Sequence, residues 1–132
     1  MTFPCRQISA SISAPSDKVY QFVADPANLP QWAAGLSGSI QKIGADWVAD
    51  SPLGRVTVRF AEKNPFGVLD HVVTLPNGEA VLNPLRVLPN GDGSEIVFTL
   101  YQRQGQSDKN FVEDAAAVER DLQKLKTILE RG

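Results

Sequence analysis

The alternation of apolar and polar residues divides this chain into a strand-rich body and one long helix at its end. Between residues 107 and 130, apolar side chains recur in steps of three and four, the spacing of a single helical face. The stripe consists of Phe111, Ala115, Val118, Leu122, Leu125 and Leu129. Ser107 or Asp108 can cap the helix, because each offers a side-chain oxygen to free backbone amides. A helix with one apolar face predicts a broad apolar surface on which it packs.

The preceding part of the chain has the pattern of an antiparallel sheet. Residues 7–13 alternate apolar and polar side chains and predict a half-buried strand. Residues 14–35 predict two short helices, separated by Asp25-Pro26. From Ser37 to Arg103, every segment is strand-like and every break is rich in turn residues. These connections are too short for parallel pairing, so they predict a meander of six strands after the first strand. The fold class is therefore α+β, with about seven strands, in a single domain over residues 1–132.

The turns also predict which side chains share a face of the sheet. A two-residue turn at Asn77-Gly78 pairs Val72 with Asn83, and a loop over residues 63–67 places Phe60 opposite Asp70. One face then collects most of the apolar residues: Ile40, Trp47, Ala49, Val56, Val58, Phe60, Val68, Val72, Val81, Leu85, Val87, Ile96, Phe98 and Leu100. This face is the expected seat of the long helix. The aliphatic residues left on the other face predict a homodimer interface: Leu69, Val73, Leu75, Leu82 and Val97.

Composition and charge exclude several classes of function. The formal net charge of −2 gives no basic footprint for nucleic acid. No apolar stretch approaches the roughly 20 residues that span a bilayer, and residues 1–10 lack a signal-peptide pattern, so we expect no integral membrane segment. The single cysteine, Cys5, excludes an internal disulfide, so a cytoplasmic location is expected. With one histidine and one cysteine far apart, no metal-ligand spacing is present, and no cofactor is expected.

Two polar residues interrupt the predicted apolar face. Asp70 and Asn83 are expected to be diagonal neighbours on adjacent strands. A carboxylate on such a face raises its pKa or finds a partner, and a carboxylate with a raised pKa can abstract a proton next to a carbonyl. Alternatively, Asn83, water or backbone amides simply hold Asp70. His71, the only histidine, is expected outside, opposite Arg59; if the faces are inverted, His71 replaces Asp70 as the candidate catalytic residue.

Large apolar side chains supply candidate walls of a ligand pocket. Flat aromatic side chains suit both a packed core and an apolar binding site. The candidate ligand-binding residues are Trp32, Trp47, Phe60, Asn83, Phe98, Phe111 and Leu122.

The chain resembles a known superfamily in three places. They are the segment from Ser11 to Tyr20 (SISAPSDKVY), the segment from Asp25 to Trp32 (DPANLPQW) and the closing helix. Together they resemble the helix-grip fold of the SRPBCC, or START-like, superfamily, in its polyketide cyclase/dehydrase and lipid-transport branch. The resemblance covers nearly the whole chain and implies a cavity between a curved sheet and the C-terminal helix. It carries over no catalytic residue, because these differ between branches.

Three functions remain open from the sequence. The first is binding of a small hydrophobic or aromatic molecule in this cavity. The second is an enzyme that cyclises or dehydrates a polyketide-like substrate, with Asp70 as acid or base. The third is a protein-interaction module without a small ligand, which predicts a filled cavity.

Overall fold

The computed structural model describes residues 1–36 and 39–131 and has an α+β fold. Ser37, Gly38 and Gly132, which belong to the predicted strand-rich region and domain, lie outside the described residues. The helices of the described residues are α1 (Ser16–Ala24), η1 (Pro26–Asn28), α2 (Leu29–Trp32), η2 (Ala34–Leu36) and α3 (Asp108–Arg131). The strands are β1 (Cys5–Ile12), β2 (Ile40–Ile43), β3 (Asp46–Ser51), β4 (Gly54–Phe60), β5 (His71–Thr74), β6 (Ala80–Asn83), β7 (Leu85–Asn90) and β8 (Gly93–Tyr101).

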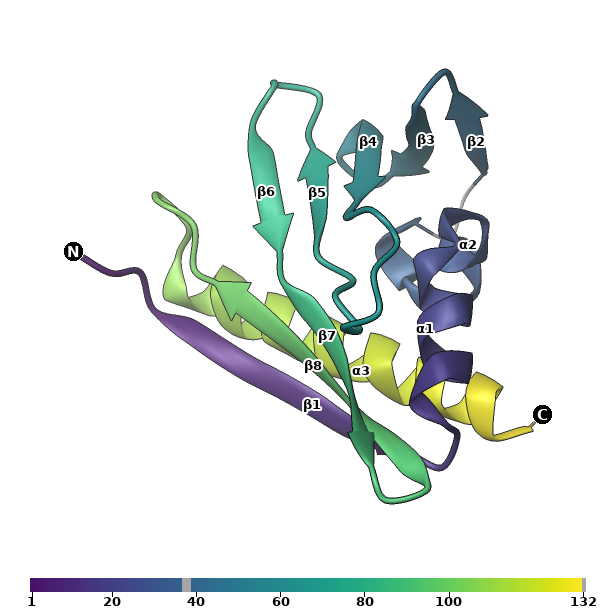
Figure 1. Ribbon diagram of the computed structural model, residues 1–132. Coiled ribbons are helices and arrows are strands. Elements are labelled where there is room, and N and C mark those ends of the chain that lie inside the picture. Colours follow the sequence, from purple (N-terminus) through teal and green to yellow (C-terminus); the bar gives the residue numbers. More distant parts are fainter. Residues whose placement is uncertain (37–38, 132) are drawn as a thin grey trace.

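The strands form two antiparallel sheets (Figure 1). The edge strand β6 of one sheet leads directly into the edge strand β7 of the other. One sheet has the order β1-β8-β7, and the other has the order β2-β3-β4-β5-β6. Pro84 separates β6 from β7; it has no backbone N–H to donate to a ladder, which favours a break at this position. The predicted single meander is therefore bent into two parts at this proline.

The segment before β5 joins the two sheets. The Leu69 N–H donates to the Leu85 carbonyl oxygen at 2.8 Å, and the Val87 N–H donates to the Gly67 carbonyl oxygen at 3.0 Å. Gly67 has a φ of 71°, and a Cβ at this position would collide with the Val87 carbonyl oxygen. Only glycine fits this close approach, because it adopts a positive φ without a steric penalty.

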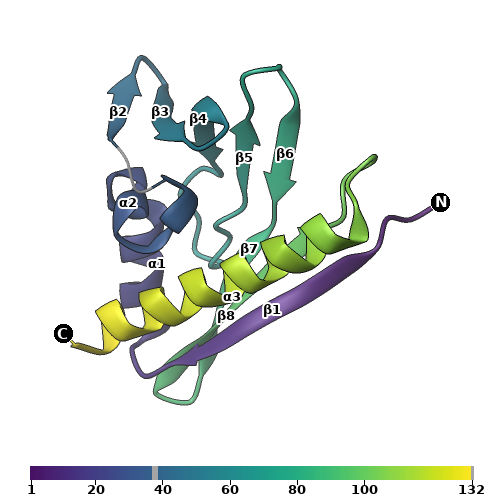
Figure 2. The same ribbon diagram turned by 180° about the vertical axis from the view of Figure 1, so that it is seen from behind.

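Helix α3 packs mainly along the β1-β8-β7 sheet. Ser107 caps it, because its Oγ accepts from the Asn110 N–H at 3.1 Å. The predicted stripe is buried at Phe111, Ala115, Leu122, Leu125 and Leu129, and Val118 is half-buried. The stripe faces β1 and β8, and the helix also contacts α2 (Figure 2). Sheet β2–β6 rises away from this seat, with β5 and β6 above β7 and with β2 and β3 above α2 in both views.

The predicted register is confirmed at three turns. Ile40 lies opposite Ala49, Trp47 lies opposite Val58, and Leu85 lies opposite Phe98. The two-residue turns at Gly44-Ala45 and Gly91-Asp92 make the first and third of these pairings, and a Ser51–Gly54 turn makes the second. The predicted apolar face of β2, β3, β4, β7 and β8 is therefore correct.

The predicted faces of β5 are wrong by one residue. Phe60 lies opposite His71 rather than Asp70, and Asn83 lies opposite His71 rather than Val72. His71 therefore lies on the inner face, with Val73, while Asp70 and Val72 lie on the outer face, because side chains alternate along a strand. Leu69 is buried as well, so two of the five residues of the predicted dimer interface, Leu69 and Val73, are not on the outer face.

Two loops of unexpected length cause this inversion. The Ala61 N–H donates to the Asp70 carbonyl oxygen, so the loop between β4 and β5 is longer than predicted, and the side chain of Asn64 organises it through four hydrogen bonds. At the next hairpin, the Gly78 N–H donates to the Leu75 carbonyl oxygen and Gly78 has a φ of 89°. This is a three-residue turn with a bulge rather than the two-residue turn predicted. Together the two shifts move β6 by two residues, which leaves its side chains on the predicted faces, so only β5 is inverted.

Among the described residues, no helix combines the length and hydrophobicity that crossing a bilayer requires.

Candidate functional site

The concave face of sheet β2–β6 presents two rows of side chains that cross neighbouring strands. The first row is Phe60, His71 and Asn83, from β4, β5 and β6. The second row is Trp47, Val58, Val73 and Val81, from β3 to β6. Successive residues on one face of a strand are about 7 Å apart, so the rows are direct neighbours. We call these seven residues the concave patch.

The concave patch is only partly covered by the rest of the molecule. Val58 and His71 are buried, but the other five side chains are half-buried. The main contacts of helix α3 are with β1, α2 and β8, so most of its apolar stripe lies against the other sheet. The patch therefore offers an apolar, largely aromatic surface that is partly open.

His71 lies at the centre of an aromatic cluster. Its ring stacks on Phe60 with the ring centroids 4.7 Å apart and the planes 24° apart. Phe98 of β8 meets the ring edge-on, with a centroid distance of 6.3 Å and an angle of 66°. The ring is 7% exposed, and its Nδ1 lies 3.0 Å from the Leu69 carbonyl oxygen. A carbonyl only accepts, so Nδ1 carries the proton of this hydrogen bond.

Burial sets the charge of His71. Loss of hydration lowers the pKa of His71 below its ordinary value, although the Leu69 carbonyl and the charge of Asp70 act in the opposite direction. The ring is therefore neutral at pH 7, with its proton on Nδ1 and a free lone pair on Nε2. Nε2 makes no hydrogen bond within the described residues. Nε2 nevertheless has some solvent exposure. Among the described residues, Trp32 Nε1 is the only side-chain nitrogen or oxygen that is both fully buried and without a hydrogen-bond partner.

Asp70 is held in an ion pair on the outer face. Its Oδ1 accepts from the Leu85 N–H and from Arg86 Nε, both at 2.9 Å, and its Oδ2 accepts from Arg86 Nη2 at 2.8 Å. The hydrogen bonds from Arg86 lower the pKa of Asp70, with a smaller contribution from the Leu85 amide. The predicted raised pKa is therefore wrong. This geometry gives Asp70 the character of a bound carboxylate rather than a poised base, and no hydrogen bond joins it to Asn83 among the described residues.

The other candidate residues fall into two groups. Phe60, Asn83 and Trp47 belong to the concave patch, and Phe98 borders it through His71. Trp32, Phe111 and Leu122 are 4%, 7% and 1% exposed. Trp32 and Leu122 belong to the packed core, whereas Phe111 is buried at the start of α3, where the guanidinium of Arg6 lies 5.8 Å from its ring centroid.

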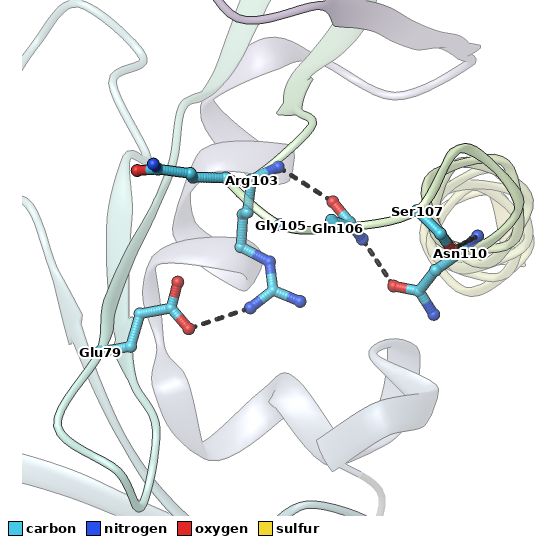
Figure 3. Close-up of a pocket in the computed structure, with 7 residues that line it drawn as sticks. Glu79, Arg103, Gly105, Gln106, Ser107 and Asn110 are labelled. Atoms are coloured by element: carbon cyan, nitrogen blue, oxygen red, sulfur yellow. Dashed lines mark hydrogen bonds and ion pairs between the residues drawn. The ribbon is translucent and has the colours of Figure 1, made fainter.

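A polar hollow of about 420 Å³ lies where the β5–β6 hairpin approaches the start of α3 (Figure 3). Arg103 Nη1 spans it to Glu79 Oε1 at 3.2 Å. The side chain of Gln106 joins the loop to the helix, because it accepts from the Arg103 N–H and donates to Asn110 and Asp114. Glu79, which lines this hollow, precedes Val81 of the concave patch by two residues. A second hollow, of about 380 Å³, lies on the opposite side, between β1, the β7–β8 turn and Lys126.

The sequence did not predict the positions of four residues that matter here. Val73 was assigned to the outer face through the one-residue shift of β5. Arg103 and Glu79 meet across two loops, and no local pattern reveals such a pair. Asp121 on α3 accepts from the Ala34 N–H at 3.2 Å, and burial raises its pKa. The only sequence feature that pointed to burial of Asp121 is its position next to Leu122 of the apolar stripe.

Metal binding finds no support in the described residues. No cluster of three or more His, Cys, Asp or Glu side chains is present among them. Cys5 is exposed at the start of β1, in the sheet that does not carry the concave patch.

A curved sheet, a long C-terminal helix and a partly open apolar interior define a helix-grip protein. Residues 6–130 match the family of polyketide cyclase/dehydrase and lipid-transport proteins, and the chain belongs to that family. No curated protein matches the sequence at a significant level.

Solved structures with low sequence identity share the fold. The Aha1 dimer from Colwellia psychrerythraea is 15% identical, with 96% of each chain covered and a TM-score of 0.76. Protein MLL2253 from Mesorhizobium loti is 13% identical, with 97% of this chain and 98% of that chain covered and a TM-score of 0.75. DynU16, a protein of the dynemicin biosynthetic locus, is 18% identical, with 96% of this chain and 47% of that chain covered and a TM-score of 0.70.

Proposed function

We propose that this protein binds a small hydrophobic or aromatic molecule against the concave patch. The observation that carries the proposal is the half-buried state of Trp47, Phe60, Val73 and Val81 on a face away from the main seat of α3 on β1. Apolar side chains left partly open on a concave surface gain free energy when a ligand covers them. The family includes lipid transport and polyketide cyclisation, which supports a ligand of this kind.

A single pair of variants tests the proposal. Val81 points to the concave side of β6, while its neighbour Leu82 points away and is 54% exposed. Val81→Phe adds bulk to the concave patch, and Leu82→Phe adds the same ring to the opposite face. We expect the wild type and Leu82→Phe to bind members of a panel of aromatic hydrocarbons, naphthols and medium-chain fatty acids, as measured by tryptophan fluorescence. Val81→Phe should bind at least about tenfold more weakly, because its ring occupies the ligand volume.

Equal binding by Val81→Phe and Leu82→Phe would contradict the proposal. Thermal unfolding of both variants serves as the control for folding. A second candidate function, a cyclase or dehydratase, is favoured by His71, whose neutral ring offers a free lone pair on Nε2 to a proton. Native mass spectrometry and NMR of the released molecule separate these functions. An unchanged ligand mass with an unchanged NMR spectrum supports a binding protein. Loss of water supports a dehydratase, and a changed spectrum at constant mass supports a cyclase, because cyclisation conserves all atoms.

A further inference from the structure

The immediate neighbours of His71 on the concave face carry no charge. Phe60 and Asn83 lie opposite His71 on the adjacent strands, and Leu69 and Val73 lie two residues before and after it. All four are neutral side chains. A ligand group that reaches this position leaves water without gaining an opposite charge, so a carboxylate or an ammonium group is disfavoured there.

Four cationic side chains of this half of the molecule lie away from His71. Arg59 pairs with Asp46 and Arg86 pairs with Asp70, both on the outer face. Lys42 lies opposite Trp47 on the edge strand β2, which is three strands from β5, or roughly 14 Å away. Arg103 spans the hollow to Glu79. None of these cations neighbours His71.

The polar groups on this part of the concave face have defined hydrogen-bonding roles. Nδ1 of His71 is occupied by the Leu69 carbonyl oxygen, so Nε2 offers an acceptor and no donor. Asn83, directly opposite, adds an amide that both donates and accepts. Phe60 stacks on the imidazole, and Trp47 lies in the neighbouring row of the concave patch. Two aromatic side chains on one face favour a flat ligand.

We infer that the ligand is a neutral, flat molecule with a phenol or enol hydroxyl group, and that this hydroxyl donates its proton to Nε2 of His71 in a hydrogen bond. Asn83 binds a second polar atom beside the hydroxyl, such as a carbonyl oxygen. The inference rests on the proposed function and adds the chemical class of the ligand. Hydrocarbons lack the donor, and carboxylates bring an uncompensated charge to an apolar position.

Three probes with one ring system test this inference. They are 2-naphthol, naphthalene and 2-naphthoate, titrated into the full chain and followed by tryptophan fluorescence. We expect 2-naphthol to bind about tenfold more tightly than either of the others, which is the range of one buried hydrogen bond. His71→Phe keeps an aromatic ring and removes the acceptor, so its preference for 2-naphthol over naphthalene should fall to about threefold or less.

A measurement on the wild type makes the test independent of that variant. In ¹⁵N NMR spectra, the signal of the unprotonated Nε2 should move when 2-naphthol is added and stay in place with naphthalene. Naphthalene or 2-naphthoate binding at least as tightly as 2-naphthol overturns this inference and leaves the proposed function standing. An unmoved Nε2 signal with bound 2-naphthol also overturns it. No binding by any of the three, together with no binding across the wider panel, overturns both.

Discussion

Asp70 gains three hydrogen bonds at the junction between the two sheets. Two come from the guanidinium of Arg86 and one comes from the Leu85 N–H, directly after the proline that breaks the edge. The Asp70 side chain is 23% exposed, against 50% for Arg86, so the carboxylate is the more sheltered partner. Charge-assisted bonds of this kind are stronger than those between neutral groups.

Asp70→Ala should lower the free energy of unfolding by about 1–3 kcal/mol, because the Leu85 N–H and the guanidinium lose their acceptor. The pKa of Asp70 is lowered in the folded protein, so its contribution is present above about pH 4 and is lost as the pH falls through the folded pKa. The variant should therefore lose less stability than the wild type between about pH 5 and 2. Urea unfolding at several pH values measures both effects.

Asp46→Ala supplies the matched control for this prediction. Asp46 also pairs with an arginine on the outer face, but both side chains are more exposed, at 38% and 68%. This change should cost less than about 1 kcal/mol. Equal losses in the two variants would contradict the structural role of Asp70.

Residue identity alone could not distinguish Asp70 from His71 as the inward residue. The two are adjacent in a strand, and their faces depend on the lengths of the loops on either side. Asn64 fixes one loop through its side chain, and Gly78 fixes the other through its positive φ. The sequence is compatible with either a two-residue or a three-residue turn at Asn77-Gly78, but Asn-Gly is most often found in two-residue turns.

At the scale of elements, α3 was predictable because its signals are local. The apolar stripe recurs at six positions, and the cap lies directly before the first helical residue. The hairpins β2–β3, β3–β4 and β7–β8 were predictable for the same reason, since short turns fix their registers. The path of α3 over β1 and β8 depends on the bend at Pro84, and that bend is a property of the assembled sheets.

Ser107→Ala should destabilise the protein by about 1 kcal/mol, because the Asn110 N–H at the first turn loses its acceptor. Asp108 follows directly and does not replace the lost bond, since its Oδ1 accepts from Gln102 Nε2. Thermal or urea unfolding measures the change. Thr127→Ala, which removes an exposed hydroxyl near the other end of α3, serves as the control, and an equal loss there would argue against a capping role.

At the scale of the whole molecule, the two sheets differ in how well they are buried. β8 lies between β1 and β7, and its inward residues Ser94, Ile96 and Phe98 are all buried. β2 is an edge strand, and its residues 41–43 are exposed. Local opening follows such differences, because few apolar contacts are lost when an exposed edge separates.

Hydrogen exchange should therefore separate the two sheets. Amides of β2 that bond to β3 should exchange at least about a hundredfold faster than those of β8, because β2 opens locally while β8 opens with the whole domain. Exchange measured by NMR at neutral pH gives these rates residue by residue. Similar protection in β2 and β8 would contradict this division and indicate one cooperative unit.

The separate seat of α3 also bears on how this fold diverges. Leu122, Leu125 and Leu129 rest on β1 and β8, whereas the concave patch belongs to β3–β6. Under the proposed function, substitutions among the half-buried residues of the patch would change which ligand is held and leave the contacts of α3 with β1 in place. Solved structures at 12–18% identity retain the fold over nearly the whole of this chain. Selection on ligand preference and selection on folding would then act on different residues.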